Sequence, residues 1–224
     1  MDTTTSSIVV AVVPMNEDAV PAVVKLHFDA FAGYMNTRIG HAYVRAFIKW
    51  FRHAENAISL VAIDSNGKVV GYVVGAPLGY NRSINRDLFW TAVVGIIIRP
   101  WLLLSDHFRR RLVGRLRLLL GYSAADNAPP LLPQPTMSLV AIAVSPSAFG
   151  RKIGLRLMRA FERRSRDLQM RSLQLSVYME NSAAIRLYKK CGWQPFYVSG
   201  KKTTAMHYFR VLCANRTTMT IYDE

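Results

Sequence analysis

The second half of the chain alternates strand-like and helix-like segments, and this order is the strongest constraint on its fold. Residues 137–144 and 173–178 are short apolar runs typical of strands. Residues 151–168 follow the first run with apolar side chains at helical spacing, and residues 181–191 follow the second as a shorter helix. Strands that alternate with helices predict a sheet covered by helices.

The first half adds a hairpin to this pattern. Residues 58–63 and 69–74 are two apolar runs separated by the turn-forming sequence Asp64-Ser65-Asn66-Gly67, which predicts antiparallel pairing. The remaining elements are expected at residues 8–13 (strand), 18–31 and 40–53 (helices), and 196–199 and 204–212 (strands). A chain of 224 residues then fits one elaborated domain, residues 1–224, with an insertion at 79–136.

Composition limits the partners and the compartment. The formal charge is +15, which favours an anionic partner such as a phosphorylated cofactor, a nucleic acid or an acidic membrane surface. Nucleic acid is the less favoured of these, because the basic residues do not interleave with aromatic ones. Two cysteines exclude a disulfide scaffold and a cysteine-built zinc site, and the histidines show no metal-ligand spacing, so no metal is expected. We expect a cytoplasmic protein.

The insertion contains an apolar segment and a basic one. Residues 88–98 are nearly all apolar but fall short of the roughly 20 needed to span a bilayer, so a buried helix is expected, with contact at a membrane interface as the alternative. Residues 106–121 predict an amphipathic helix with Arg110, Arg111, Arg115 and Arg117 on one face. That face is either simply solvated, or it touches a membrane surface through residues 88–121, or it recognises a phosphorylated acceptor.

Residues 144–154 predict an anion site. A strand ends at Val144, and a helix begins near Lys152 after a turn that contains Gly150. The first backbone N–H groups of a helix have no partner within it and attract anions. Gly150 and Gly154 would let a ligand approach the backbone closely, although a plain connection with packing glycines fits equally well.

A second motif follows the strand at residues 173–178. Asn181, Ala184, Tyr188, Gly192 and Trp193 form the pattern Asn–x–x–Ala–x–x–x–Tyr–x–x–x–Gly–aromatic. With the preceding loop, this pattern resembles the GCN5-related N-acetyltransferase (GNAT) family. The family's usual loop, Arg/Gln-x-x-Gly-x-Gly/Ala, corresponds here to Phe149, Lys152 and Gly154, so that only the last position agrees.

The resemblance implies a fold and a cofactor site. The fold is α/β (α+β), with a mixed, mostly antiparallel sheet splayed between its fourth and fifth strands (residues 137–144 and 173–178), helices on both faces, and a helical insertion between strands three and four. Acetyl-CoA would lie in the resulting wedge. The implied cofactor-binding residues are Ile142, Ala143, Val144, Gly150, Arg151, Lys152, Ile153, Gly154, Leu155, Asn181, Ala184 and Tyr188.

The resemblance also implies the reaction, which is direct attack of a neutral amine on the thioester. Tyr188 would be the general acid, with packing on the sheet as the alternative role. Glu180, at the end of a strand beside the cleft, is the carboxylate proposed as base, with a solvated loop-end acid as the alternative. Other acids, in the early region that would wall the acceptor site, are Asp18, Asp29 and Glu55. The acceptor would be a primary amine of a small molecule or a peptide. A catalytically silent acyl-CoA-binding module that uses the insertion for membrane or partner contact is the alternative function, and homodimerisation stays open.

Overall fold

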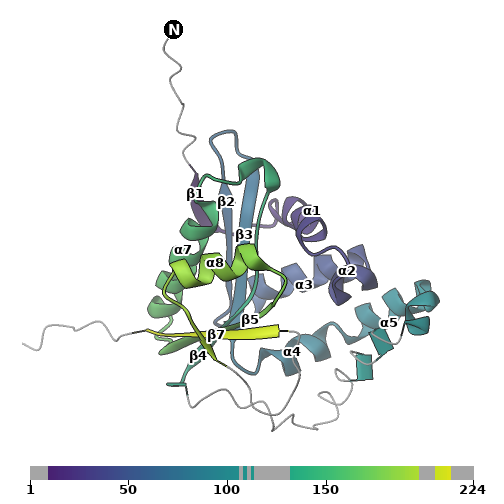
Figure 1. The fold of residues 1–224 in the computed structure, drawn as a ribbon. Helices are drawn as coiled ribbons and strands as arrows, with labels where there is room; N and C mark the ends of the chain where they lie inside the picture. The colour runs from purple at the N-terminus through teal and green to yellow at the C-terminus, as the bar shows by residue number, and fades with distance from the viewer. Residues whose placement is uncertain (1–9, 106–107, 110–111, 114–131, 197–204, 213–224) are drawn as a thin grey trace, which may run out of the picture.

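In the computed structural model, residues 10–105, 108–109, 112–113, 132–196 and 205–212 can be described. Seven strands form one sheet in the order β1-β2-β3-β4-β5-β7-β6 (Figure 1). Their bounds are β1 Ala11–Pro14, β2 Ile58–Ile63, β3 Val69–Pro77, β4 Thr136–Val144, β5 Ser172–Tyr178, β6 Gln194–Phe196 and β7 Ala205–Val211. All neighbours are antiparallel except β4 and β5, so the predicted mixed sheet is confirmed.

The parallel strands β4 and β5 pair only where they begin. Their paired residues are Thr136 with Ser172, Met137 with Leu173, and Ser138 with Gln174. β4 continues to Val144 and β5 to Tyr178, so the two strands diverge over most of their length. The predicted splay is confirmed, and it opens toward the carboxyl ends of both strands.

Helices cover both faces of the sheet (Figure 1). On one face lie α1 Val20–Ala30, α2 Met35–Ile39 and α3 His41–His53, with a core that includes Val24, Phe47 and Phe51. On the other face lie α7 Ile153–Asp167 and α8 Ser182–Lys190, with Leu157 and Phe161 buried against the sheet. The expected helices on both faces are therefore present, and each end lies within two residues of its predicted place. The five-residue helix α2 was not predicted, because it is too short to show a helical period.

The insertion between β3 and β4 begins with three short helices. These are α4 Tyr80–Asp87, α5 Phe89–Ile98 and the 3-10 helix η1 Pro100–Leu104. Of the expected basic helix at 106–121, only residues 108–109 and 112–113 are described, so Arg110, Arg111, Arg115 and Arg117 lie outside the described residues.

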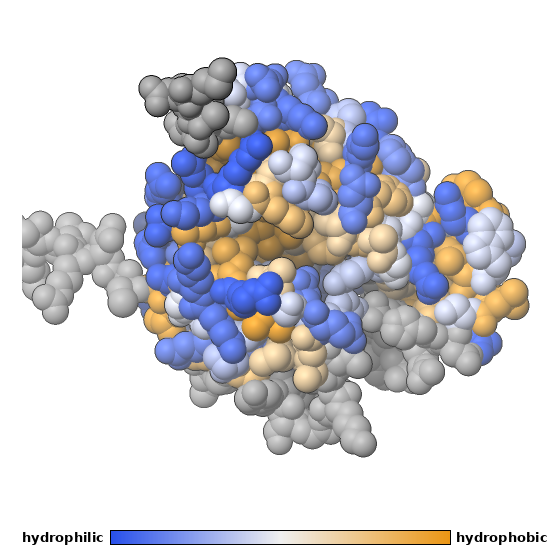
Figure 2. Space-filling model, turned by 45° about the horizontal axis from the view of Figure 1, so that its top comes forward, coloured by the Kyte–Doolittle hydropathy of each residue, from blue (hydrophilic) through white to orange (hydrophobic). Residues whose placement is uncertain are grey.

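The expectation of a buried helix at residues 88–98 is wrong. α5 contains no fully buried residue, and Trp90, Ile97 and Ile98 are 74%, 71% and 62% exposed. The helix α5 packs beside α2 and α3, away from the sheet (Figure 1). It forms a lobe at the right of Figure 2, where apolar side chains gather on the surface. Only one side of a single helix can pack there, and because this sequence is apolar all round, its other side is left to solvent. In the described part of the chain, no helix has the length and apolarity that a membrane crossing requires.

Candidate active site

A cavity of about 520 Å³ lies where the wedge opens, at the carboxyl end of β4. Its walls come from the end of β4, the following loop with the 3-10 turn η3 Pro146–Ala148, the start of α7, and one side of α8. The end of α1 closes it with Asp29 and Phe31. We call it the cofactor cavity, because its wall contains the predicted anion-binding loop.

The loop at the start of α7 relies on two left-handed residues. Gly150 has φ +79°, and Lys152, directly before the helix, has φ +58° and ψ +20°. A lysine in this region is uncommon, since its Cβ crowds the backbone. The conformation explains why the family's pattern has glycine at this position. The loop therefore keeps its bend although lysine replaces the glycine.

The charges and dipoles at this end of the cavity suit an anion. The Lys152 and Lys190 side chains both contribute to its wall, and the first turn of α7 contains no acidic residue. N–H groups of the first α7 turn point outward from the helix, and the helix dipole adds roughly 0.3–1 kcal/mol for an anion placed there. Residues Ile142 and Leu187 give the inner part of the cavity an apolar wall. A phosphate at the loop and an uncharged chain in the wedge would fit this division.

Asn181 contributes to the cavity and also caps α8. Its side-chain oxygen accepts a hydrogen bond from the backbone N–H of Ala184 at 3.1 Å. The capping bond uses the oxygen of the amide and leaves its nitrogen as a donor for a ligand.

Most of the predicted cofactor residues do meet at this cavity. The residues that line it are Ile142, Ala143, Val144, Gly150, Lys152, Ile153, Gly154, Leu155, Asn181 and Ala184. Arg151 is exposed and is not among the lining residues, whereas Tyr188 lines the next cavity. The sequence reasoning missed Leu187 and Lys190, which follow Ala184 at helical spacing and could have been inferred. Asp29, which was expected near the acceptor site, lines the cofactor cavity instead, and Phe31 was missed because no local signal exists for it.

A second cavity, of about 300 Å³, continues the wedge toward the middle of the sheet. It shares Phe31, Ile142, Asn181 and Ala184 with the cofactor cavity, so the two adjoin. Tyr188 lines it and is only 4% exposed, and burial raises the pKa of this phenol well above its ordinary value. Tyr188 is therefore protonated at any physiological pH and can act as a donor.

Trp193, the aromatic residue that ends the motif, supports Tyr188. Their ring centroids lie 6.1 Å apart, and the backbone N–H of Trp193 donates to the Tyr188 carbonyl at 3.0 Å. The indole Nε1 of Trp193 donates to the buried carboxylate of Glu162 at 3.0 Å, and Arg210 donates to the same oxygen at 3.0 Å. This network joins the end of α8 to α7 and β7, and so holds the Tyr188 ring in place.

A bulge in β4 faces the same cavity. Val74 pairs with Ala141 but Gly75 pairs with Leu139, so Val140 is the extra residue of β4. A bulge interrupts the hydrogen-bond ladder and redirects the backbone, and bulges are frequent beside active sites. Val140 lines the second cavity and two of its neighbours.

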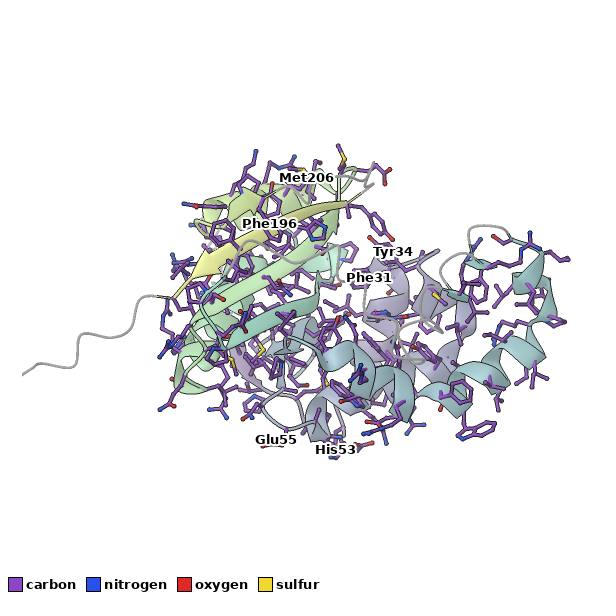
Figure 3. The ribbon with its side chains drawn as sticks, turned by 90° about the horizontal axis from the view of Figure 1, so that it is seen from below. Phe31, Tyr34, His53, Glu55, Phe196 and Met206 are labelled. Atoms are coloured by element: carbon purple, nitrogen blue, oxygen red, sulfur yellow. The ribbon has the colours of Figure 1, made fainter. Side chains whose placement is uncertain are left out.

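One of these neighbours, of about 340 Å³, lies between the sheet, α2, α3 and α4, and we call it the acceptor cavity. It shares Phe31, Tyr34, Val140, Ala141 and Tyr178 with the second cavity. Figure 3 shows Phe31 and Tyr34 at the border between the sheet and the helices, and the ring centroids of Tyr34 and Tyr178 are 5.1 Å apart.

The described walls of the second and acceptor cavities contain no carboxylate. Glu180 is exposed and is absent from the walls of all three cavities, so the structure does not bring it together with Tyr188. The acceptor cavity contains instead a buried histidine, His27, whose pKa burial lowers to about 4. His27 is thus neutral near pH 7.

Comparison with known proteins agrees with this geometry. Residues 99–193 match the model of the acetyltransferase (GNAT) family. A search of curated proteins finds no match.

Solved structures resemble the chain over nearly its whole length. An acetyltransferase of the GNAT family from Staphylococcus aureus Mu50 has a TM-score of 0.57 at 11% identity, covering 92% of this chain and 100% of that one. Arabidopsis thaliana NAA60, solved with acetyl-CoA, has a TM-score of 0.56 at 14% identity (91% and 99% covered). A ribosomal-protein-alanine N-acetyltransferase from Brucella melitensis has a TM-score of 0.54 at 17% identity (90% and 99% covered). The chain therefore has the fold of the GNAT acetyltransferases, and its residues 99–193 carry the sequence pattern of that family.

Proposed function

We propose that the protein is an N-acetyltransferase that transfers the acetyl group of acetyl-CoA to a primary amine. The observation that carries the proposal is the continuity of the wedge. An anion-binding loop opens into a partly apolar cavity, which adjoins a cavity lined by a buried phenol, and this cavity adjoins one with space for an acceptor.

The chain's residues take separate parts in this proposal. Lys152 and the first N–H groups of α7 bind the cofactor pyrophosphate, and Asn181 and the end of β4 hold the pantetheine arm. The backbone at the Val140 bulge supplies polar groups beside the reacting carbonyl. Tyr188 gives its proton to the sulfur as the carbon–sulfur bond breaks and the carbon–nitrogen bond forms, and the proton that the newly bonded nitrogen loses passes through water and restores the Tyr188 phenol.

The acceptor amine has to be neutral to attack. Because no carboxylate lies in the described walls of the acceptor cavity, the surroundings do not stabilise an ammonium group. We therefore infer that the amine loses its proton to water, at the cavity mouth or before entry, and that Glu180 takes no direct part.

A calorimetric titration with acetyl-CoA, followed by a thiol-release assay over a panel of amines, tests the proposal. Tight binding with thiol release on at least one amine would support it. Binding without turnover on any amine would favour the acyl-CoA-binding module instead. No binding at all would overturn both.

A further inference from the structure

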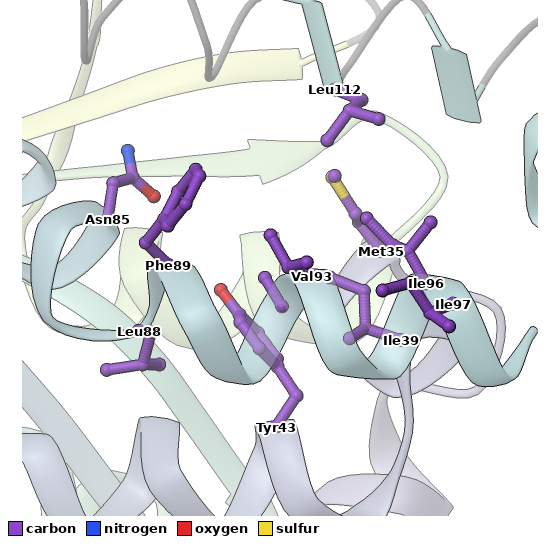
Figure 4. Close-up of a pocket in the computed structure, with 11 residues that line it drawn as sticks. Met35, Ile39, Tyr43, Asn85, Leu88, Phe89, Val93, Ile96, Ile97 and Leu112 are labelled. Atoms are coloured by element: carbon purple, nitrogen blue, oxygen red, sulfur yellow. The ribbon is translucent and has the colours of Figure 1, made fainter.

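An apolar pocket of about 240 Å³ lies beneath α5, against α2 and α3 (Figure 4). Met35 and Ile39 form its wall on α2, and Phe89, Val93 and Ile96 form the wall on α5. The other described lining residues are apolar as well, except Tyr43 and Asn85. Apolar cavities of about 150 Å³ already hold a benzene ring, so this pocket has room for a hydrocarbon group of larger size.

Specific contacts hold α5 over the pocket at both ends. At one end Gly95 sits directly on Ile39, where an added Cβ would come within 2.6 Å of the Ile39 side chain. Arg99, just beyond the helix, donates to the Ile39 carbonyl at 2.9 Å. At the other end the Trp50 indole donates to Asp87 at 2.9 Å. The pocket is thus part of the folded framework and not a chance gap between loosely packed helices.

The pocket continues the acceptor cavity. Met35, Tyr43 and Asn85 line both, so the apolar pocket adjoins the space in which the acceptor would lie. The path runs from Tyr188 through the acceptor cavity to the underside of α5.

The described walls of these two cavities contain no Asp, Glu, Lys or Arg. A buried phosphate or carboxylate without a charged partner would be strongly disfavoured there. The described lining therefore favours an acceptor with an uncharged apolar end.

We propose that the acceptor is an amphiphilic amine, whose amino group lies beside Tyr188 and whose apolar tail lies in the pocket beneath α5. This proposal rests on the proposed N-acetyltransferase function and names the substrate class of that site. Each buried methylene is worth about 0.8 kcal/mol, so successive methylenes should raise kcat/KM roughly fourfold each until the pocket is filled.

The test uses unbranched primary amines from propylamine to octylamine, with acetyl-CoA saturating and thiol release as the readout. The wild-type protein should show rising kcat/KM with chain length and then a plateau. Val93→Trp fills the pocket and should reduce the octylamine-to-propylamine ratio of kcat/KM by at least tenfold. Val94→Trp, on the next residue of the same helix, is the matched control, because Val94 is 53% exposed and does not line the pocket. It should leave the ratio unchanged.

Two results would overturn the proposal: turnover of propylamine with no dependence on chain length, or equal effects of Val93→Trp and Val94→Trp. Calorimetric titration of octylamine separates this failure from that of the proposed function. Octylamine binding that Val93→Trp abolishes, without acetylation of any amine, would keep the pocket assignment and reject the enzyme. Acetylation of amines, without octylamine binding that depends on Val93, would keep the enzyme and reject the pocket assignment.

Discussion

The Nδ1 atom of His27 lies 2.5 Å from the hydroxyl oxygen of Tyr72, and this hydrogen bond joins α1 to β3 in the interior. Burial lowers the pKa of His27 to about 4 and raises the pKa of Tyr72 well above its ordinary value. Both groups are therefore uncharged near neutral pH. Because His27 also lines the acceptor cavity, the pair gives that cavity a polar but neutral wall.

The His27 pair should make stability depend on pH. In the unfolded chain the histidine has a pKa near 6.5, so between about pH 6.5 and pH 4 the unfolded state binds more protons than the folded one. The contribution of neutral His27 to the free energy of unfolding is fully present above pH 6.5 and is lost as the pH falls through that window. We expect a loss of roughly 2 kcal/mol in unfolding free energy between pH 7.5 and pH 5. Urea denaturation at the two pH values measures it.

His27→Gln should remove this loss, because glutamine does not titrate. His53→Gln, at an exposed position at the end of α3, is the control and should keep the wild-type pH dependence. The assignment fails if the His27 variant shows the same pH dependence as the wild type.

Lys152 should contribute its charge to acetyl-CoA binding. Lys152→Asn removes the ammonium group while asparagine tolerates the left-handed conformation at φ +58°. We expect the dissociation constant to rise roughly fivefold at low salt, equivalent to about 1 kcal/mol, and the difference to shrink at high salt. Arg151→Gln, next to it but outside the cavity wall, should have a smaller effect. Equal effects of the two variants would mean that only overall charge matters.

Gly154 should be sensitive to the size of its replacement. A Cβ there would come within 3.2 Å of the Leu187 side chain, which lines the cofactor cavity. Gly154→Ala requires a shift of only a few tenths of an ångström, whereas Gly154→Val adds bulk between α7 and α8. The valine variant should therefore bind acetyl-CoA at least tenfold more weakly than the alanine variant while staying folded by circular dichroism. Unchanged affinity in a folded valine variant would exclude this loop as the binding site.

Tyr188→Phe should lower kcat without weakening acetyl-CoA binding, because the ring stays and only the proton donor is lost. General acid catalysis of this kind is worth roughly 10²–10⁴-fold. Since burial raises the pKa of Tyr188, its titration should not appear in the pH–rate profile of the wild type below about pH 10. Steady-state kinetics with saturating amine measure both effects. A wild-type kcat in the variant would reduce Tyr188 to a packing residue.

We propose that the insertion also touches an anionic membrane surface through residues 88–121, which is one of the interpretations of its sequence given above. Trp90 on α5 and Trp101 on η1 are 74% and 60% exposed, and exposed tryptophan is typical of membrane interfaces. Replacing both by serine should weaken binding to anionic vesicles tenfold or more in a sedimentation assay. Val211→Ser, an exposed apolar position on β7, is the control. If the wild-type protein does not sediment with anionic vesicles at low salt, the idea is wrong.

Sequence periodicity was enough to predict most elements of this fold. Apolar residues at helical spacing in α7, and the turn between β2 and β3, are local features, and local backbone preferences decide both. The motif from Asn181 to Trp193 was equally informative, because a spacing of seven residues, about two helical turns, already places Asn181 and Tyr188 on one face of the helix.

The tertiary structure alone decided which of these residues meet. Arg151 lies in the predicted loop yet does not line the cavity, while Phe31 reaches it from the residue after α1, more than a hundred positions earlier. The exposure of α5 also could not be predicted, because a segment that is apolar all round has no polar side to show which way it faces. Periodicity reports how residues lie within one element, whereas the walls of a cavity depend on how separate elements pack, and that is set by contacts between residues far apart in the chain.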